Sequence, residues 1–296
     1  MDQTPSVVIF GEVLFDRFPG GEVVLGGAPF NVAWNLRALG LAPLLVSRVG
    51  RDELGDRILE AMQRWEMDTR GVQRDEAHAT GTVEVTVEDG EPSFDIAADR
   101  AYDHITAEGV PALASGSLLY HGSLALRGES SAAALDALRG RMEGPVFMDV
   151  NLRAPWWEAG RVWSSMDRAT WVKLNDHELA ALAPEPGGIE VRTARLLEKG
   201  AMRGAVVTRG PEGVYFRKED GTALRPDPVP AAEVVDTVGA GDAFSSVVIL
   251  GLVREWPWPL ILGRALEFAA AVVGLRGAIT EERSFYRSFV EKWELS

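Results

Sequence analysis

Short apolar runs alternate along this chain with longer amphipathic runs, and this alternation restricts the possible folds. Residues 6–11 (SVVIFG) form a short apolar run that predicts a buried strand. Residues 29–39 predict a helix, because proline opens the run and Gly40 ends it. Buried strands separated by helices are typical of a mostly parallel sheet with helices on both faces. The chain is therefore expected to have an α/β fold.

The same alternation continues to the end of the chain. Further strands are predicted at residues 44–49, 117–121, 146–149, 171–173 and 205–208. Further helices are predicted at residues 52–65, 130–139, 176–183, 190–199, 240–253, 259–273 and 283–293. Residues 213–216 and 221–224 predict a hairpin. No repeat or linker interrupts the pattern, so one domain spanning residues 1–296 is expected.

One segment departs from this pattern. Residues 80–88 (TGTVEVTVE) alternate strictly, and a turn at Asp89 and Gly90 and a short run at 93–96 follow them. This pattern predicts a hairpin with one buried and one open face. Residues 22–25 (EVVL) are expected to add a strand. We therefore predict a small antiparallel flap that grows out of the main sheet, built from about residues 12–26 and 79–104.

Composition excludes several classes of protein. The formal net charge is −14 with no basic stripe, which disfavours a nucleic-acid partner. The chain has no cysteine, so disulfides, thiolate metal sites and a thiol nucleophile are excluded. Residues 1–6 lack the basic start of a signal peptide, and no apolar run approaches the ~20 residues of a membrane span. A soluble, cytoplasmic protein without a membrane partner is expected. The four histidines lack the spacing of metal ligands.

Residues 236–244 (DTVGAGDAF) predict a binding site for an anion. Gly239 and Gly241 flank Ala240, and the apolar helical run 243–253 follows directly. A glycine turn that opens a helix leaves several N–H groups unpaired at the positive end of the helix dipole. The amides of Gly239, Ala240 and Gly241 are therefore candidates to stabilise the charge on a transferred phosphoryl group.

Asp242 adds a possible base to this anion site. A carboxylate one step into the turn can accept a proton from an attacking hydroxyl, and phosphoryl transfer needs little beyond positioning, a base and charge neutralisation. On this pattern alone, the alternative that Asp242 only caps the helix stays open. No G-x-x-x-x-G-K-[ST] sequence is present, and no G-x-G-x-x-G follows Gly11. A P-loop nucleotidase and a dinucleotide-dependent dehydrogenase are thereby disfavoured.

Residues 236–244 resemble the C-terminal signature of the PfkB (ribokinase-like) carbohydrate kinases, and residues 26–40 (GGAPFNVAWNLRALG) resemble their N-terminal signature. Residues 175–178 and 208–213 are similar to the N-x-x-E and T-x-G-x-x-G motifs of the family. The resemblance thus covers nearly the whole chain. It implies a ribokinase-like three-layer α/β/α fold with a central, mostly parallel sheet and a small β-flap that serves as a lid.

The resemblance also implies roles on the phosphate side of the site. Asp242 would be the catalytic base, with the Gly239, Ala240 and Gly241 amides as the anion hole. ATP would be bound by residues that include Asn175, Thr208, Gly210, Gly213 and Gly241. Glu178 would organise Mg²⁺, partly through water, and the backbone at Asp236 would contribute to a site for a monovalent cation such as K⁺. The alternative that Asn175 merely caps the next helix, with Glu178 at its third position, is compatible with these roles.

On the sugar side, the resemblance implies substrate contacts from Asp16, Gly26, Gly27 and Asn31. Phe94 on the flap would cover the apolar face of the sugar, although a role in the flap core alone stays open. Arg153 would bind a substrate or phosphate oxygen, unless it forms an ordinary ion pair, for example with Asp149. The expected partners are a small sugar and ATP. The exposed flap also favours a homodimer.

The substrate remains open among several sugars. The segments 11–16 (GEVLFD), 26–36 and 149–157 (DVNLRAPWW) are similar to those of bacterial fructokinases. The last segment also occurs in 2-keto-3-deoxygluconate kinases, where its arginine holds a carboxylate. Such enzymes usually have a second arginine on the flap, and residues 94–99 contain none. Fructose is therefore the first expectation, the keto-deoxy acid the second, and ribose or a nucleoside lies further behind.

Two further alternatives concern the donor and catalysis. Residues 268–278 resemble the adenine side of the family's site but have Ala270 where an asparagine is often found, so a donor other than ATP stays open. A sugar-sensing binding protein that has lost catalysis is the alternative from another class. Loss of the base or of a glycine in the turn would mark such a protein, and all are present here.

Overall fold

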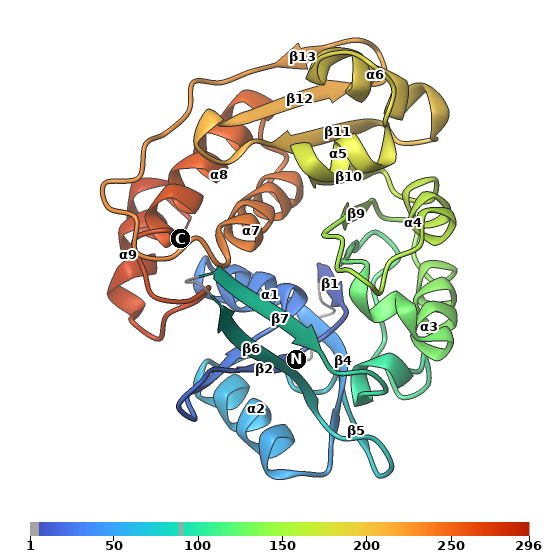
Figure 1. Ribbon diagram of the computed structural model, residues 1–296, viewed down its shortest axis with the longest axis vertical. Helices are drawn as coiled ribbons and strands as arrows, with labels where there is room; N and C mark the ends of the chain where they lie inside the picture. Colours follow the sequence, from blue (N-terminus) through green and yellow to red (C-terminus); the bar gives the residue numbers. More distant parts are fainter. Residues whose placement is uncertain (1–5, 89–90, 296) are drawn as a thin grey trace.

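The protein is described by a computed structural model that covers residues 6–88 and 91–295 (Figure 1). Within these residues, a large nine-stranded sheet has the order β13-β12-β11-β10-β9-β8-β1-β4-β5. Its strands are β1 (Val7–Phe10), β4 (Leu44–Gly50), β5 (Val72–Asp75), β8 (Leu118–His121), β9 (Val146–Asp149), β10 (Trp171–Asn175), β11 (Gly204–Thr208), β12 (Val214–Lys218) and β13 (Ala223–Leu224). All neighbouring pairs from β11 to β5 are parallel, whereas β12 and β13 are antiparallel additions.

Helices cover both faces of this sheet (Figure 1). They are α1 (Ala28–Ala38), α2 (Glu53–Arg64), α3 (Glu129–Arg139), α4 (Ala159–Met166), α5 (Asp176–Leu182), α6 (Ile189–Lys199), α7 (Ala240–Val253), α8 (Trp258–Val272) and α9 (Arg283–Lys292), with short 3₁₀ helices η1 (Ala101–His104), η2 (Leu124–Arg127) and η3 (Gly210–Glu212). The predicted three-layer α/β/α architecture is confirmed.

The alternation of side chains along β1 explains the two helical layers. Val7 and Ile9 belong to a core cluster that contains side chains of α1, α2, α7, α8 and α9. Val8 and Phe10 point to the opposite face, where α3 contributes to the core, and α4 to α6 continue that layer over β9 to β11. All four residues are fully buried. An apolar side chain at every position is what a strand covered on both faces requires.

The flap is a second sheet with the order β3-β2-β6-β7. Its strands are β2 (Leu14–Arg17), β3 (Val23–Gly26), β6 (Gly81–Glu88) and β7 (Glu91–Ile96). The prediction of a wholly antiparallel flap is wrong, because β2 and β6 pair in parallel. These strands follow β1 and β5, which run in the same direction through the main sheet, and so they enter the flap in the same direction. The predicted turn at Asp89 and Gly90 lies outside the described residues.

The sequence pattern did not predict β5 or α4. β5 has the sequence VQRD, with a single apolar residue, so its alternation is too short to recognise. α4 contains glycine and two serines in eight residues, which are poor helix formers. Its burial of Val162 and Met166 against the sheet stabilises the helix nonetheless. In the described part of the chain, no helix combines the length and the apolar character needed to cross a membrane.

Candidate active site

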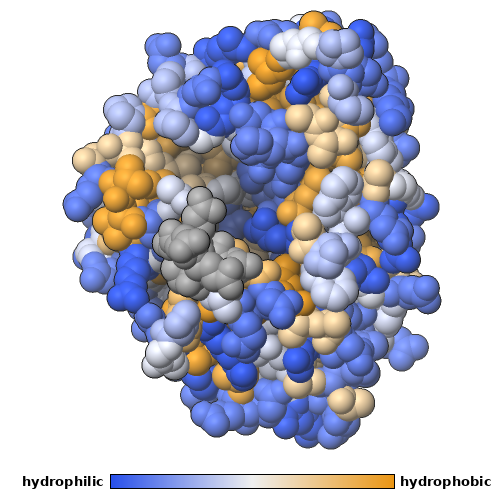
Figure 2. Space-filling view, viewed as in Figure 1, coloured by the Kyte–Doolittle hydropathy of each residue, from blue (hydrophilic) through white to orange (hydrophobic). Residues whose placement is uncertain are grey.

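A cavity of about 510 Å³ lies between the flap and the carboxyl ends of the central strands. Asp149, Lys173, Asn175 and Thr208 line it from β9, β10 and β11, and Asp16 lines it from the flap. The space-filling view in Figure 2 shows that this face of the molecule is hollowed near its middle. Ligands of open α/β sheets bind in crevices outside the carboxyl ends of the strands. The cavity is therefore the candidate active site.

The glycine turn before α7 forms one wall of the cavity. Gly239 precedes the helix with φ of +80°, and a β-carbon there would clash with Ala278, so glycine is required by both conformation and space. Gly239, Gly241 and Asp242 line the cavity. Of the three predicted anion-hole amides, only that of Ala240 has a backbone acceptor among the described residues, and its 3.4 Å contact with the Thr237 carbonyl is long. The amides of Gly239 and Gly241 can therefore bind an anion.

Asp242 lies at the end of this turn and faces the cavity. Its Oδ2 accepts a 2.8 Å hydrogen bond from Nδ2 of Asn31, which leaves Oδ1 without a hydrogen-bond partner among the described residues. Burial raises the pKa of Asp242 to about 6, the Asn31 hydrogen bond opposes this rise and the negative charge of Asp149 adds to it. A fixed carboxylate with a pKa near neutrality is suited to accept a proton.

A buried ion pair adjoins the turn. Lys173 Nζ donates to Asp149 Oδ2 at 2.7 Å, and Ser245 Oγ donates to the same oxygen at 2.9 Å. Although burial alone would lower the pKa of Lys173, the charge and hydrogen bond of Asp149 raise it, so the ammonium group stays charged. A β-carbon on Gly241 would lie 3.1 Å from Lys173 Nζ. A positive charge thus lies beside the glycine turn.

Asp16, Asn31, Phe94 and Arg153, which were predicted to contact the substrate, line the cavity together with Gly27. Burial raises the pKa of Asp16 to about 6, while the positive charge of Arg153 opposes the rise. Gly27 has φ of +106°, and a β-carbon there would lie 2.8 Å from the Glu12 carbonyl oxygen. Glycine is therefore required at this position by the neighbouring backbone, whereas the approach to a sugar stays a prediction.

Arg153 does not form the ion pair that the sequence left open. Asp149 pairs with Lys173, and within the described residues no carboxylate lies within 4.0 Å of the Arg153 guanidinium. The positive charge of Arg153 nevertheless acts on Glu12, Asp16 and Asp242, since it lowers the pKa of each. The guanidinium is thus available to a substrate oxygen.

Glu12, Asp149 and Lys173 are cavity residues that the sequence patterns did not assign to the site. Glu12 is 3% exposed, and its Oε2 has no hydrogen-bond partner among the described residues. Burial raises the pKa of Glu12 to about 7. A signal for two of these residues exists in the sequence, because Asp149 and Lys173 interrupt or end apolar strands, where a charge must be paired or functional.

Asn175 and Glu178 form the predicted cap of α5 and also line the cavity. Glu178 Oε2 accepts from the Asn175 amide and Oε1 accepts from the Leu152 amide, both at 2.8 Å. The Glu178 amide in turn donates to Asn175 Oδ1. Both carboxylate oxygens are already engaged by the backbone, which favours contact with a cation through water over direct ligation.

Of the remaining predicted residues, Thr208 lines the cavity, whereas Gly26, Gly210, Gly213 and Asp236 are not part of its lining. Gly26 ends β3, where a β-carbon would lie 3.1 Å from Asp16 Oδ2. Thr208 lines the cavity, and Gly210 and Gly213 follow it in and after η3 with φ of +53° and +84°. Asp236 links two loops, because its carboxylate accepts hydrogen bonds of 3.0 Å from the amides of Val238 and Gly277.

Comparison with known proteins shows the family to which the chain belongs. Residues 6–284 match the pfkB family of carbohydrate kinases. The chain is 32% identical over 266 residues to a fructokinase of Klebsiella pneumoniae, which covers 83% of this chain and 84% of the relative. In three dimensions it resembles an uncharacterized sugar kinase of Pyrococcus horikoshii solved in complex with ATP, with a TM-score of 0.80, 26% identity and coverage of 92% and 93%.

A fructokinase of Vibrio cholerae O395, solved with fructose, ADP and a calcium ion, shares the fold with a TM-score of 0.82. Its sequence identity is 24%, and the alignment covers 95% of this chain and 97% of the other. The family match extends from β1 to the start of α9 and includes the flap, the glycine turn and Asp242. The chain therefore belongs to the pfkB family of carbohydrate kinases and is a phosphotransferase that acts on a sugar.

Proposed function

We propose that this protein is an ATP-dependent fructokinase in which Asp242 is the catalytic base. The observation that carries the proposal is the Asp242 carboxylate, which faces the cavity with one oxygen held by Asn31 and lies beside amides that lack good acceptors. A base and an anion site next to each other are what the transfer of a phosphoryl group to a hydroxyl requires.

The proposed reaction follows from this geometry. Asp242 Oδ1 accepts the proton of the sugar hydroxyl as that oxygen attacks the γ-phosphorus of ATP, and ADP departs with the electrons of the broken P–O bond. The Gly239 and Gly241 amides and the Lys173 ammonium stabilise the negative charge on the transferred group. Asn31 keeps the Asp242 carboxylate in place. Asp16 accepts hydrogen bonds from other sugar hydroxyls and so orients the substrate.

The residues present also suit a divalent cation such as Mg²⁺. Asp149 Oδ1 is buried without a hydrogen-bond partner among the described residues, and Glu178 carries negative charge at the same end of the sheet. Oxygen ligands and retained water are what Mg²⁺ prefers. Bound there, the cation would neutralise phosphate charge and orient the phosphate chain. Thr208, Gly210 and Gly213 are proposed to contact the nucleotide, and the backbone near Asp236 is proposed to hold K⁺.

Fructose is proposed as the acceptor on the similarity to fructokinases. The second candidate is 2-keto-3-deoxygluconate, and the unpaired Arg153 guanidinium in the cavity favours it, because a carboxylate would pair with this charge. The flap side of the cavity supports fructose instead, since Leu14, Val83, Phe94 and Ile96 line it with apolar side chains and offer no second cation.

A phosphorylation screen tests both candidates. The purified protein is incubated with ATP and Mg²⁺ and with fructose, 2-keto-3-deoxygluconate, ribose or adenosine, and the release of ADP and the phosphorylated product are measured. We expect the highest kcat/KM for fructose, and Arg153→Gln should lower it far less than it lowers activity on the keto-deoxy acid. A higher kcat/KM for the keto-deoxy acid, abolished by Arg153→Gln, would replace fructose by the second candidate. If none of the four compounds is phosphorylated, both candidates are refuted.

A further inference from the structure

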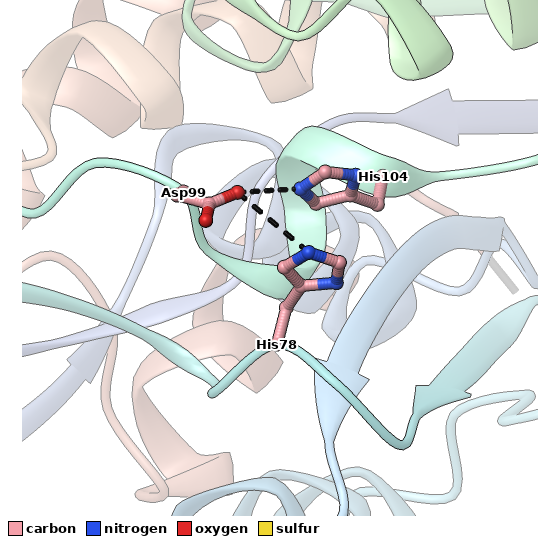
Figure 3. Close-up of side chains that lie close together, drawn as sticks. All are labelled: His78, Asp99 and His104. Carbon is pink, nitrogen blue, oxygen red and sulfur yellow. Dashed lines mark hydrogen bonds and ion pairs between the residues drawn. The ribbon is translucent and has the colours of Figure 1, made fainter.

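Two histidines that are 26 residues apart in the sequence meet at the base of the flap (Figure 3). His78 precedes β6, and His104 ends η1, which follows β7. Their rings stack with centroids 3.6 Å apart and planes inclined by 14°. Asp99, from the segment between β7 and η1, points its carboxylate at the same edge of the stack. Its Oδ1 lies 2.8 Å from His104 Nε2 and 3.7 Å from His78 Nε2.

Asp75 controls the tautomer of His78. The Asp75 carboxylate is 2% exposed and accepts hydrogen bonds from the amides of Ala77 and His78 at 2.7 and 2.8 Å. Both of its oxygens lie 3.2 Å from His78 Nδ1. The two amide donors and the Arg48 guanidinium that contacts Asp75 Oδ2 all favour the carboxylate form of Asp75, so the proton of His78 is assigned to Nδ1, which donates to it.

This arrangement leaves the Nε2 atom of His78 as a hydrogen-bond acceptor that a cation would stabilise. With the proton on Nδ1, neutral His78 directs the lone pair of Nε2 at the negatively charged Asp99 Oδ1, which is repulsive unless a cation lies between them. The carboxylate–histidine pair formed by Asp75 and His78 is the arrangement that fixes the ring of a metal-ligating histidine in proteins. Arg48 forms a 2.5 Å ion pair with Asp75, whereas Asp99 faces the open edge of the two rings with a side chain that is 75% exposed.

We propose that His78, His104 and Asp99 form a binding site for a divalent transition-metal ion of the Zn²⁺ or Co²⁺ type. Tetrahedral ligands at about 2.0–2.1 Å from such an ion lie roughly 3.4 Å from one another. The two Nε2-to-Oδ1 distances, 2.8 and 3.7 Å, bracket this value. To bind one ion, the two rings have to splay apart from their 14° stack so that both Nε2 lone pairs point at it, and the exposed Asp99 side chain has to move with them. Binding releases the proton that His104 Nε2 donates to Asp99, and water completes the coordination.

A metal ion bound at this position would join the two ends of the β6–β7 hairpin. His78 lies before the first strand of the β6–β7 hairpin, whereas Asp99 and His104 lie after the second strand. The Ala101 amide already donates to the Ala79 carbonyl at 2.9 Å, so the two segments are held together before a metal binds. The metal closes the hairpin at its base, which restricts opening of the strands that carry Val83, Phe94 and Ile96 over the cavity. This inference is independent of the acceptor proposed above.

Cobalt binding tests the proposal directly. Metal-free protein is titrated with Co²⁺ in excess Mg²⁺, which occupies oxygen-ligand sites in the cavity, and uptake is followed by calorimetry and by visible absorption. We expect one equivalent to bind to the wild type. His104→Gln and His78→Gln should each weaken binding by more than tenfold, and Asp75→Asn by about 10–100-fold although it removes no ligand.

His177→Gln is the matched control, because the His177 side chain is 94% exposed and lies far from this cluster in the sequence. It should bind Co²⁺ as the wild type does. Co²⁺ should also raise the melting temperature of the wild type and of His177→Gln but not that of His104→Gln. Hydrogen exchange should become slower in β6 and β7 in the two proteins that bind. Failure of the wild type to take up Co²⁺ in excess Mg²⁺, or unchanged affinity in His104→Gln, would overturn the proposal.

Discussion

Asp242 combines burial, a fixed orientation and a raised pKa, and each property has a named cause. The chain direction at the start of α7 aims the carboxylate at the cavity, Asn31 holds one oxygen, and burial accounts for most of the rise in pKa. None of these depends on a bound ligand. The proposed base is thus organised before the substrate arrives, which lowers the cost of reorganisation during the reaction.

Replacement of Asp242 by asparagine tests the role of the base. Asp242→Asn keeps the size and the contact with Asn31 but cannot accept the proton. We expect kcat to fall by about 10²–10⁴-fold, while the dissociation constants of sugar and nucleotide, measured by calorimetry, change little. Asp227→Asn, at an exposed position, is the control and should leave kcat unchanged. Retention of a tenth of the wild-type kcat in Asp242→Asn would remove Asp242 from the role of base.

The pH dependence of the wild-type rate gives a second measure of the same group. The base must be ionised to accept a proton, and the pKa of Asp242 is about 6 in the folded protein, chiefly because of burial. kcat/KM should therefore be constant above neutrality and fall by at least tenfold for each pH unit below about 6, since Asp16, which is proposed to bind the sugar, has a similar pKa. A profile that stays flat down to pH 5 would contradict the raised pKa.

The raised pKa of Glu12 is expected to affect the free energy of unfolding instead of the rate of turnover. Burial raises its pKa from 4.5 to about 7, so its ionised form is less favourable in the folded protein than in the unfolded chain. The free energy of unfolding should consequently fall as the pH rises from below 4.5 to above 7. Glu12→Gln removes this ionisation. It should raise the free energy of unfolding at pH 8 by up to about 3 kcal/mol, and the gain should vanish near pH 4.

Urea denaturation at the two pH values measures the Glu12 effect. Glu60→Gln, at an exposed position of α2, is the control and should change the free energy of unfolding little at either pH. An equal gain for Glu12→Gln at pH 4 and pH 8 would mean that ionisation of Glu12 is not its cause. A loss of stability at pH 8 would indicate that Glu12 is compensated by a partner.

The secondary elements differ in how far the sequence alone determined them. Strands that contain a run of apolar residues, such as β1 and β4, and helices with clear start and stop signals, such as α1, were predicted within one residue of their observed ends. The direction of β2 relative to β6 was predicted wrongly, because it depends on the relative direction of β1 and β5, which precede them and are far from each other along the chain. Local patterns contain no information on such a pairing.

The same distinction holds for the candidate site. Residues in contiguous motifs, such as Asp242 and Asn31, were predicted and line the cavity. Glu12, Lys173 and the meeting of His78 with His104 were not predicted, since each depends on which distant segments the fold brings together. A lone charge in an apolar strand indicates that a partner exists but does not identify it.

Replacement of Phe94 tests whether the flap acts as a lid over the sugar. The Phe94 side chain is 49% exposed and lines the cavity beside Val83 and Ile96. We expect it to cover the sugar and to exclude water from the phosphoryl group. Phe94→Ala should raise the sugar KM roughly tenfold through lost apolar contact. It should also make the ratio of ADP to phosphorylated sugar exceed one, since water then competes as the acceptor.

Asp95→Ala is the matched control for the flap, because Asp95 is the next residue of β7 and its side chain points to the opposite face. It should leave both the sugar KM and the product ratio unchanged. ADP and phosphorylated sugar are measured in the same reaction by separate coupled assays. A ratio of one in Phe94→Ala would show that the flap does not shield the phosphoryl group from water.

The assembly of the whole molecule depends on the edges of the flap. β3 and β7 are the outermost strands of the four-stranded sheet, and an outer strand presents N–H and C=O groups that can pair with a second chain. β3 carries Val23, Val24 and Leu25 in a half-buried run, which is favourable for pairing and lacks the charges that usually block it. The protein is therefore expected to form a homodimer through its flap.

Light scattering after size-exclusion chromatography tests the dimer. The wild type should elute with twice the mass of one chain, and Val24→Lys should elute with the mass of one chain, because a charged lysine on the edge strand opposes pairing. Val191→Lys, on α6 and away from the flap, removes an equally apolar side chain that is 43% exposed and should stay dimeric. A wild type with the mass of a single chain would exclude the dimer. If Val24→Lys stays dimeric while Val191→Lys dissociates, the interface lies on the helical layer instead, and the flap then opens and closes independently in each subunit.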